Sequence, residues 1–495
     1  MIKRSRSFQE GNMNAKTDQK KRKKTGNRDA IDNLGQRYRL TGALGEGGQG
    51  KVCLTNFPNV LVKVRTSKNL EQNKEWLRHV KWLMRQDLEQ LQIARPVSII
   101  KKPKSVFGYV LQLMDGLEPI KEMIEKTHIS LCEDGSMEGF SATGGLKRRV
   151  YLLKELAKNL NKLHSRGMAY GDLSLENIFI SQSADDHQVW LIDCDNICFS
   201  EREGHGHIHT PGYAAPEVVR QESGVNIATD CWSFAVIAMQ LLTDNHPFTS
   251  SFFCDDAEDT ERVLEQAHSG ELPWIYDESD DSNCWDESGI PLELVTNNKT
   301  FTLFERCFST GKNQPYQRPS MAEWQDILDQ SYSRLVICEN SQDCGSHYFY
   351  NDKHVCDFCD SEQVLNHSLK LDYFFYNDEF DKNEDPETSP WINTDYSQLV
   401  NLDQTIDLHL NPAGSEHYHE SPRLCSIELT AKALRILPQN KSKVLMIRSS
   451  DQKTLEIKRQ ASLKQEVKKG EQFELHIWYC DSTNRPAHIV WKFTW

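Results

Sequence analysis

The sequence lacks the features that would place this chain in a membrane or outside the cell. Its 495 residues contain no continuous apolar run of about 18 residues, so we expect no membrane-spanning helix. The first residues, MIKRSRSFQEGN, are basic, but no apolar core follows them, so we expect no secretory signal. Hydrophobic residues make up 38% of the chain, below the roughly 45–50% of average globular proteins, so some segments should be tails or long loops.

Cysteine is too sparse for a disulfide-stabilised fold, with 14 residues in the whole chain. Most of these cysteines stand singly, as is typical of proteins in the reducing cytoplasm, which is the location that we expect. Four of them gather between positions 338 and 359, and this cluster needs a separate explanation.

The net charge of −14 is unevenly distributed along the chain. Residues 1–30 contain ten Lys or Arg, three Asp or Glu and almost no apolar side chains, so we expect a disordered basic tail over 1–36. The run KKRKK at 20–24 is compatible with a solvated tail, with nucleic-acid binding or with an address signal. The acidic remainder argues against nucleic acid as the main partner, except through this tail.

A carboxylate and an amide stand together in the segment YGDLSLEN at 170–177. Before it, apolar residues recur at three- and four-residue steps over 142–164, which predicts a helix with one buried face. After it, two short apolar runs within 177–192 predict a small hairpin. Asp172 and Asn177 therefore lie in a loop between a helix and a hairpin, where they either cap turns or form a reaction centre.

A glycine-rich segment, LGEGGQGKV, carries the pattern G-x-G-x-x-G at Gly45, Gly47 and Gly50. A Walker loop needs Ser or Thr after its Lys, but Val52 stands there, and a Rossmann turn should open a helix. The residues that follow alternate as strand, turn, strand, so we predict a glycine loop at a hairpin tip, where backbone amides can approach phosphates. Lys63, in the second strand, is either an ordinary strand lysine or a phosphate ligand.

These patterns together resemble the eukaryotic-type protein kinase superfamily over residues 37–333. The Y-G-D-L-S loop is similar to that of bacterial Ser/Thr kinases. The matching motifs occur in the family's order: GEGGQGKV at 45–52, Lys63, Asp172, Asn177, Asp193 in IDCD, TPGYAAPE at 210–217, Asp230 and Arg318.

The resemblance implies an enzyme that uses ATP and magnesium to phosphorylate Ser or Thr in protein substrates. Asp172 is implied to be the catalytic base, and Asn177 and Asp193 are implied to hold magnesium. Asp230 is implied to brace the catalytic loop, and Arg318 to pair with Glu217. The residues implied to bind the nucleotide are Gly45, Glu46, Gly47, Gly50, Val52, Lys63 and Glu75.

The partner of Lys63 has two candidates in the sequence. Residues 68–86 predict a helix in which Glu71 and Glu75 share a face. We favour Glu75, because the apolar residues of the helix then pack around its middle.

Several residues depart from the family's pattern. Gly171 replaces the Arg that many members have before the catalytic Asp, which suggests activation without loop phosphorylation. Ser174 replaces a Lys that would stabilise the transferring phosphate, and Asp195 replaces the Gly of D-F-G. These departures leave open a catalytically weak pseudokinase scaffold, and a Gly-Asp loop leaves open a small-molecule phosphotransferase. Thr210 favours Ser or Thr as the acceptor.

Histidines at 205, 207 and 209 alternate with other residues in the implied activation segment. They form either a zinc site or a polar loop, and they also allow a response to pH near neutrality.

The four clustered cysteines are Cys338, Cys344, Cys356 and Cys359. Two pairs about twelve residues apart suit a tetrahedral structural zinc ion, and the unit over 334–365 resembles a zinc ribbon. Its first spacing is wider than C-x2-C, so His347 is an alternative ligand. A disulfide, or neither a metal nor a disulfide, is also open.

The last hundred residues contain apolar runs separated by polar turns, which predict a small antiparallel β-sandwich over 395–495. We expect Trp478, Trp491 and Trp495 either to pack in its core or to form a binding surface for a partner.

The predicted fold class is a multidomain α+β chain: a bilobal kinase fold, a small zinc ribbon and a C-terminal all-β module. The predicted boundaries are 1–36 for the tail, 37–116 and 117–333 for the two kinase lobes, 334–365 for the ribbon, 366–394 for an acidic linker and 395–495 for the β module.

Overall fold

A computed structural model describes most of the chain. The described residues are 29–46, 50–104, 106–112, 116–183, 186–200, 210–249, 257–351, 353, 355–363, 368–376, 390–410, 421–439, 441–465, 470–480 and 486–495. The predicted tail up to residue 28, Gly47 and the three alternating histidines at 205–209 lie outside these residues. Among the described residues, no helix combines the length and the apolar character needed to cross a membrane.

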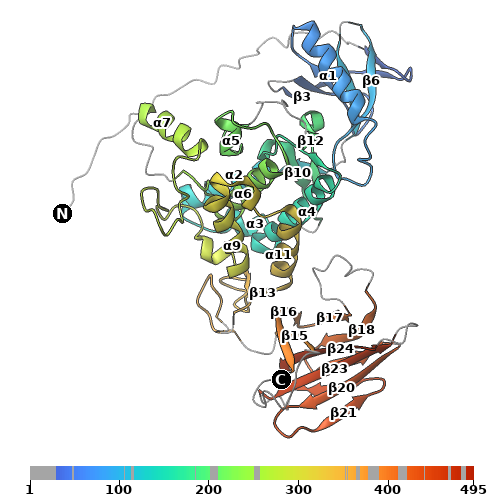
Figure 1. The fold of residues 1–495 in the computed structure, drawn as a ribbon, viewed down its shortest axis with the longest axis vertical. Helices are drawn as coiled ribbons and strands as arrows, with labels where there is room; N and C mark the ends of the chain where they lie inside the picture. Colours follow the sequence, from blue (N-terminus) through green and yellow to red (C-terminus); the bar gives the residue numbers. More distant parts are fainter. Residues whose placement is uncertain are drawn as a thin grey trace, which may run out of the picture. The chain divides into compact units, whose positions relative to one another are not determined.

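The chain divides into two compact units, Met1–Met84 with Pro96–Leu113 and Arg85–Arg95 with Met114–Trp495. The first unit is a seven-stranded sheet in the order β2-β1-β6-β7-β5-β4-β3. Helix α1 lies along this sheet (Figure 1). The bounds are β1 Asp29–Asp32, β2 Arg37–Arg39, β3 Gly42–Glu46, β4 Gly50–Leu54, β5 Val60–Arg65, α1 Leu70–Leu83, β6 Pro96–Lys102 and β7 Gly108–Gln112.

Strand β1 begins inside the segment predicted to be a disordered tail, so that prediction is wrong for residues 29–36. The physical reason is Asp32, a buried carboxylate that accepts hydrogen bonds from Tyr38, Ser98 and two backbone amides. These bonds fix the chain against the sheet although the local sequence is polar.

Helix α1 confirms the helix predicted at 68–86 but is shorter at both ends, because Asn69 caps the backbone amides of Glu71 and Gln72 and the helix ends at Leu83. Its buried face carries Trp76, whose ring contacts the ring of Tyr109 in β7 at 5.7 Å. The helix is therefore anchored to the sheet by its middle turn, as predicted.

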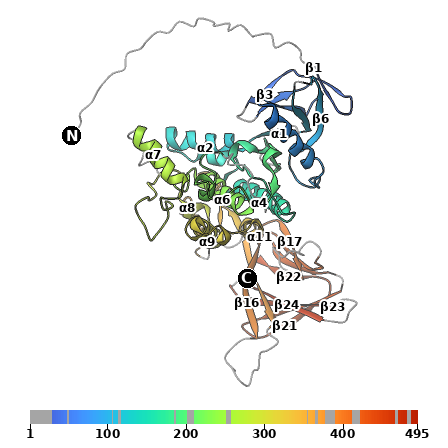
Figure 2. The same ribbon diagram turned by 45° about the horizontal axis from the view of Figure 1, so that its top comes forward.

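The second unit begins with a mainly helical region. Its bounds are β8 Leu117–Pro119, α2 Ile120–Asp134, α3 Glu138–Ala142, α4 Gly145–His164, β9 Met168–Ala169, β10 Ile178–Ser181, β11 Val189–Leu191, β12 Cys198–Phe199, α5 Pro216–Val219, α6 Ile227–Thr243, α7 Ala257–His268, α8 Leu292–Val295, α9 Asn298–Phe308, α10 Thr310–Asn313 and α11 Met321–Ser333. Figure 2 shows α6 among the helices of this region. Helix α6 carries fourteen buried residues and is the centre of the core.

Helix α4 confirms the predicted helix but begins at Gly145 rather than at 142. Ala142 is the last residue of α3, and Gly144 has a positive φ of 99°, so the chain turns between the two helices. The hairpin predicted within 177–192 is confirmed, because β10 and β11 pair antiparallel.

A short two-stranded ladder and a β-rich region complete the second unit. The bounds are β13 Leu335–Ile337, β14 His347–Phe349, β15 Ser368–Tyr376, β16 Trp391–Asn401, β17 Gln404–His409, β18 Arg423–Leu429, β19 Ala433–Pro438, β20 Ser442–Arg448, β21 Thr454–Ile457, β22 Ala461–Lys464, β23 Gln472–Cys480 and β24 Pro486–Thr494. One sheet has the order β16-β15-β24-β23-β20-β21 and the other β17-β18-β19-β22, and both contribute to one buried cluster.

The acidic linker predicted at 366–394 is wrong in its first part, because residues 368–376 form β15 in the larger sheet. Alternate residues of this strand, such as Leu369 and Leu371, are buried. This period of two predicts a strand, but the acidic residues nearby in the sequence suggested a linker instead. Trp491 and Trp495 pack in the core, whereas Trp478 is half-buried outside it.

Candidate active site

The glycine-rich segment lies where a hairpin was predicted. Strands β3 and β4 pair antiparallel, with Gly45 opposite Val52 and Glu46 opposite Lys51. Gly47 lies outside the described residues. A Cβ atom at Gly50 would be 2.8 Å from the carbonyl oxygen of Val64, so no larger residue fits there without movement of the backbone.

Lys63 occupies the neighbouring strand, directly opposite Val52 on one side and Tyr109 on the other. Its side chain is only 4% exposed, although lysine is almost never buried unless it has an anionic partner. Glu75 and Glu71 are both exposed on α1, and Glu71 forms an ion pair with Lys74 at 2.8 Å. The choice of Glu75 as partner of Lys63 therefore stays a prediction.

Asp230, near the start of α6, binds the backbone of the loop that carries Asp172. The Asp230 carboxylate is 1% exposed and accepts hydrogen bonds from the backbone amides of Tyr170 (2.6 Å) and Gly171 (2.9 Å). Nε2 of His164, the last residue of α4, lies 3.0 Å from the same carboxylate. Two helices thus fix the loop, as the predicted bracing role of Asp230 requires.

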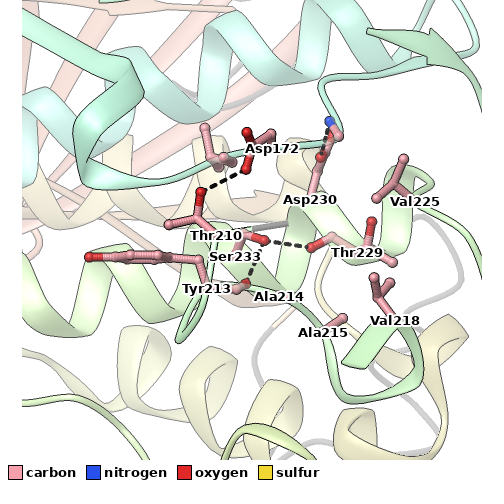
Figure 3. A pocket seen from close by; sticks show the side chains of 12 residues that line it. Asp172, Thr210, Tyr213, Ala214, Ala215, Val218, Val225, Thr229, Asp230 and Ser233 are labelled. Carbon is pink, nitrogen blue, oxygen red and sulfur yellow. Dashed lines mark hydrogen bonds between the residues drawn. The ribbon is translucent and has the colours of Figure 1, made fainter. Parts of the chain in front are cut away.

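Asp172 itself is partly exposed and receives two side-chain hydrogen bonds. The hydroxyl of Thr210 donates to Oδ1 at 2.8 Å (Figure 3). The amide of Asn196 donates to Oδ2 at 3.2 Å. Asn177 donates to the backbone carbonyl of Asp172 at 2.8 Å. Thr210 and Asn177 stand in motifs that were recognised in the sequence. Asn196 was not predicted, because its only signal was its place three residues after Asp193.

Asn177 immediately precedes β10 and Asp193 follows β11, so both residues stand at the same end of the β10–β11 hairpin. The amide of Ile192 donates to the carbonyl of Asn177 at 2.9 Å, so the backbones that carry the two side chains lie side by side. Asp193 has a positive φ of 61°, a conformation that costs energy in residues other than glycine and occurs at functional sites.

Tyr170 is fully buried beside these carboxylates, and its hydroxyl donates to the carbonyl of Ile192. Burial raises the pKa of this phenol well above its usual value, and the negative charges of Asp193 and Asp172 raise it further. Tyr170 therefore stays neutral and acts as a rigid spacer between the loop and the hairpin.

The segment 210–217 is anchored at several points. Arg318 donates two hydrogen bonds to the carboxylate of Glu217, at 2.7 and 2.8 Å, and both side chains are buried, as predicted. Ser233 of α6 donates to the carbonyl of Tyr213 at 2.7 Å, and Nε2 of His246 lies 2.9 Å from the carbonyl of Gly212.

A small pocket opens beside Asp172, on the side of this anchored segment (Figure 3). Its walls carry mostly small and apolar side chains from the segment and from α6. The lining residues are Gly171, Asp172, Leu173, Thr210, Tyr213, Ala214, Ala215, Val218, Val225, Thr229, Asp230 and Ser233.

The four predicted cysteines come together around β13 and β14. Their sulfur atoms all lie within 4.8 Å of one another, with Cys338 and Cys359 3.6 Å apart and Cys344 and Cys356 3.9 Å apart. Four thiolates at Zn–S distances of about 2.3 Å in a tetrahedron would be separated by about 3.8 Å, so the donor set fits zinc. None of the four is in a disulfide, and His347 is not in the group.

Comparisons with known proteins agree with this geometry. Residues 38–333 match the model of the protein kinase domain. The chain is 25% identical over 229 residues to maternal embryonic leucine zipper kinase of Danio rerio, a match that covers 44% of this chain and 31% of that protein. It is 26% identical over 282 residues to calcium/calmodulin-dependent protein kinase type 1 of Macrobrachium nipponense, which covers 55% of this chain and 71% of that protein.

A shorter match, 31% identical over 106 residues, relates the chain to protein kinase C delta type of Mus musculus and covers 21% of this chain and 15% of that protein. For the first of these relatives, the matched region is about a third of the relative's own length. The residues matched to the family model end at 333, before the cysteine cluster and the β-rich region.

Proposed function

Because this chain belongs to the protein kinase family, we propose that it transfers the γ-phosphate of ATP to Ser or Thr hydroxyls of protein substrates. The observation that carries the proposal is the setting of Asp172. Asp230 fixes the loop that carries Asp172. The Asp172 carboxylate already accepts a hydrogen bond from a hydroxyl group, that of Thr210, at 2.8 Å. A substrate hydroxyl at a similar distance would be within reach for proton transfer.

Each residue at the site has one role in this proposal. Asp172 orients the acceptor hydroxyl and takes its proton, while Asn196 and Thr210 keep the carboxylate in place. Asn177 and Asp193 would supply oxygen ligands to magnesium, which neutralises charge on the phosphates when it is bound. Lys63 and the amides of the glycine loop would bind the phosphates of ATP.

Ser174 is the residue from which we infer the rate of phosphotransfer. It is completely buried, and its hydroxyl has no hydrogen-bond partner among the described residues. It places no cation where many family members have Lys to stabilise the transferring phosphate, so we expect slow phosphotransfer.

The acceptor class follows from Thr210 by the resemblance to Ser/Thr kinases. We therefore expect phosphoserine and phosphothreonine, and no phosphotyrosine, among the products.

We also propose that Cys338, Cys344, Cys356 and Cys359 hold one structural zinc ion. The support is the close approach of four sulfur atoms in a segment with few buried apolar residues of its own. The zinc unit and the β-rich region would then serve as accessory modules, the latter for recognition of a protein partner.

Transfer of labelled γ-phosphate tests the proposed activity. We expect magnesium-dependent labelling of the kinase or of a general protein substrate, and a fall of roughly 10²–10⁴-fold in Asp172→Asn, as loss of a general base predicts. The matched control is Asp329→Asn, which removes a carboxylate that pairs with Lys154 on α4.

Equal labelling by Asp172→Asn and the control would contradict the role of Asp172. No labelling by any variant would favour the pseudokinase scaffold, and labelling of small alcohols alone would favour a small-molecule phosphotransferase. Metal analysis tests the zinc site separately, with one zinc ion per chain expected.

A further inference from the structure

The larger sheet of the β-rich region has a second face, opposite the core, that carries a group of histidine and tryptophan side chains. Odd-numbered residues of β23 and β24, such as Leu475 and Trp491, point into the shared core. Because side chains alternate along a strand, the even-numbered residues lie on the opposite face. That face carries Glu474, His476, Trp478 and His488, with Trp391 from β16 beside them.

Two imidazole groups face each other on this surface. Nδ1 of His476 and Nε2 of His488 lie 3.1 Å apart. Two nitrogens bound at 2.0–2.1 Å to one ion would be separated by about 2.9 Å in a square-planar site and about 3.4 Å in a tetrahedral one. The observed distance lies between these values, so both nitrogens can bind the same ion with little movement.

A carboxylate lies behind one of the two rings. Oε2 of Glu474 is 3.1 Å from the remaining nitrogen of His476, Nε2, and Oε1 of Glu474 is 2.9 Å from the ammonium of Lys492. A histidine that binds a metal usually donates its other N–H to a carboxylate, which fixes its tautomer and leaves the facing nitrogen unprotonated. Glu474 stands in that position, and Lys492 is neutralised by it.

Aromatic rings hold the imidazoles in this orientation. Trp478 stacks on His488 with ring centroids 4.0 Å apart, and Trp391 meets both imidazoles edge to face, at 4.7 and 5.2 Å. His476 is 7% exposed beneath these rings, whereas His488 is partly accessible. Side chains fixed by packing on rigid strands are what a preformed ligand set requires.

We propose that His476 and His488 form a second metal site, which binds one borderline transition-metal ion through two imidazole nitrogens and is completed by water. Imidazole ligands without thiolate suit Cu²⁺, Ni²⁺ and Zn²⁺, and Cu²⁺ is the ion that such ligands bind most tightly. The site is distinct in chemistry from the four-sulfur cluster and does not depend on phosphotransfer.

Copper titration of the full-length chain tests this site. The protein is first given one equivalent of zinc, and Cu²⁺ is then added while tryptophan fluorescence and the copper electron paramagnetic resonance spectrum are recorded. We expect one Cu²⁺ per chain to quench the fluorescence, because Trp478 and Trp391 contact the ligating rings, and we expect hyperfine splitting from two nitrogens. His488→Gln and His476→Gln should each lose the saturable quenching.

Glu474→Gln gives a graded test, because loss of an outer carboxylate should weaken copper binding about 10–100-fold without abolishing it. The matched control is His79→Gln, which removes a histidine stacked on Trp82 at 5.2 Å. Effects are compared between variants, so any copper that reaches the cysteine cluster affects all of them equally.

Equal copper binding and quenching in wild type and His488→Gln would overturn the proposal and leave a hydrogen-bonded histidine pair only. Retention of the wild-type melting temperature in His488→Gln shows that lost binding is not lost folding. If His488→Gln does not fold, the copper affinity of Glu474→Gln tests the proposal instead. A copper affinity equal to that of the wild type also overturns the proposal.

Discussion

At the scale of single residues, the loop that carries Asp172 departs from the pattern of related kinases at Gly171. It has a φ of 83°, and a Cβ atom at this position would lie 2.9 Å from the carbonyl oxygen of Asn196. The arginine found in many family members cannot occupy this backbone conformation without strain. Glycine at this position therefore suits the local backbone conformation. The sequence shows the glycine but not the conformation that requires it.

Gly171→Ala should damage the loop while leaving every functional group in place. We expect a loss of about 1–3 kcal/mol in the free energy of unfolding, because an L-residue with this φ and this contact is strained. Phosphotransfer should fall as well, since the amide of residue 171 is bound by Asp230. Urea unfolding and a labelling assay measure both effects, and Gly135→Ala, also at positive φ but with open space around it, is the control for strain alone.

His246 predicts how stability responds to pH. Its ring is partly buried, Nδ1 accepts a hydrogen bond from the amide of Phe248 and Nε2 donates to the carbonyl of Gly212, so the neutral form is required. Burial lowers its pKa from 6.5 to about 4, and the charge of nearby His268 lowers it further. Between these two values the unfolded chain binds the proton and the folded chain does not, so acid favours unfolding.

The free energy of unfolding should therefore be constant above pH 6.5 as far as His246 is concerned, and fall as the pH drops from 6.5 to about 4. The full effect is about 3 kcal/mol, at 1.36 kcal/mol per unit of pKa shift. Urea unfolding across this range measures it. His246→Gln keeps a donor toward Gly212 but cannot titrate, so an unchanged pH slope in this variant would rule out the assignment.

Motifs of fixed order predicted two contacts that the structure contains, that of Asp230 with the loop before Asp172 and that of Arg318 with Glu217. The catalytic role of Asp172 and the magnesium-binding roles of Asn177 and Asp193 stay predictions. The same motifs did not predict a role for Asn196. Its contact with Asp172 depends on the conformation of the short 3-10 helix Cys194–Asn196, which the motifs do not specify. The partner of Lys63 could not be fixed either, because the helix period places Glu71 and Glu75 on one face.

At the scale of elements, a buried ion pair joins helix α5, which carries Glu217, to the turn before helix α11, which carries Arg318. The side chains of Arg318 and Glu217 are 1% and 8% exposed, and Arg318 also donates to the carbonyls of Gly311 and Ala228. The pair links the segment beside Asp172 to the start of α6 and to the turn before α11. Arg318 also lies over the ring of Trp232, with its guanidinium carbon 5.0 Å from the centroid.

Glu217→Gln should cost about 3–5 kcal/mol of stability, because it leaves the Arg318 charge buried without its counter-ion. Differential scanning calorimetry measures the change. The matched control is Glu176→Gln, which breaks the exposed pair with Lys121 and should cost less than about 1 kcal/mol. Similar losses in both variants would mean that burial does not set the strength of the Glu217 pair.

Elements were predictable where the hydrophobic period was long and unbroken, as in α4 and in strands β18, β20, β23 and β24. Strand β15 was missed because the acidic residues that follow it suggested a linker. Strand β1 was missed because its support comes from Asp32, a polar residue that is buried through tertiary hydrogen bonds. Tertiary contacts of this kind leave no local pattern in a sequence.

At the scale of the whole molecule, the cysteine cluster lies between the region matched to the kinase family and the β-rich region. Phe358, inside the second cysteine pair, contacts Phe140 of α3 with ring centroids 6.5 Å apart. On the other side, Leu399 of β16 packs into the same small cluster as Cys338 and Cys356. A metal at the cysteines would therefore stabilise the contacts on both sides.

Removal of zinc should loosen this connection without unfolding the regions on either side. A thiol-competing chelator is expected to open the segment 338–363 to limited proteolysis, because its few buried apolar residues do not hold it folded without metal. Mass spectrometry should find a fragment ending in this segment and a fragment containing the intact β-rich region. Cys356→Ser should show the same cleavage without chelator, while Cys132→Ser, an exposed cysteine outside the cluster, should not. If chelator and Cys356→Ser both leave the cleavage pattern unchanged, the four thiols are not held by a metal, and the small apolar cluster around Tyr348 alone must keep the segment folded.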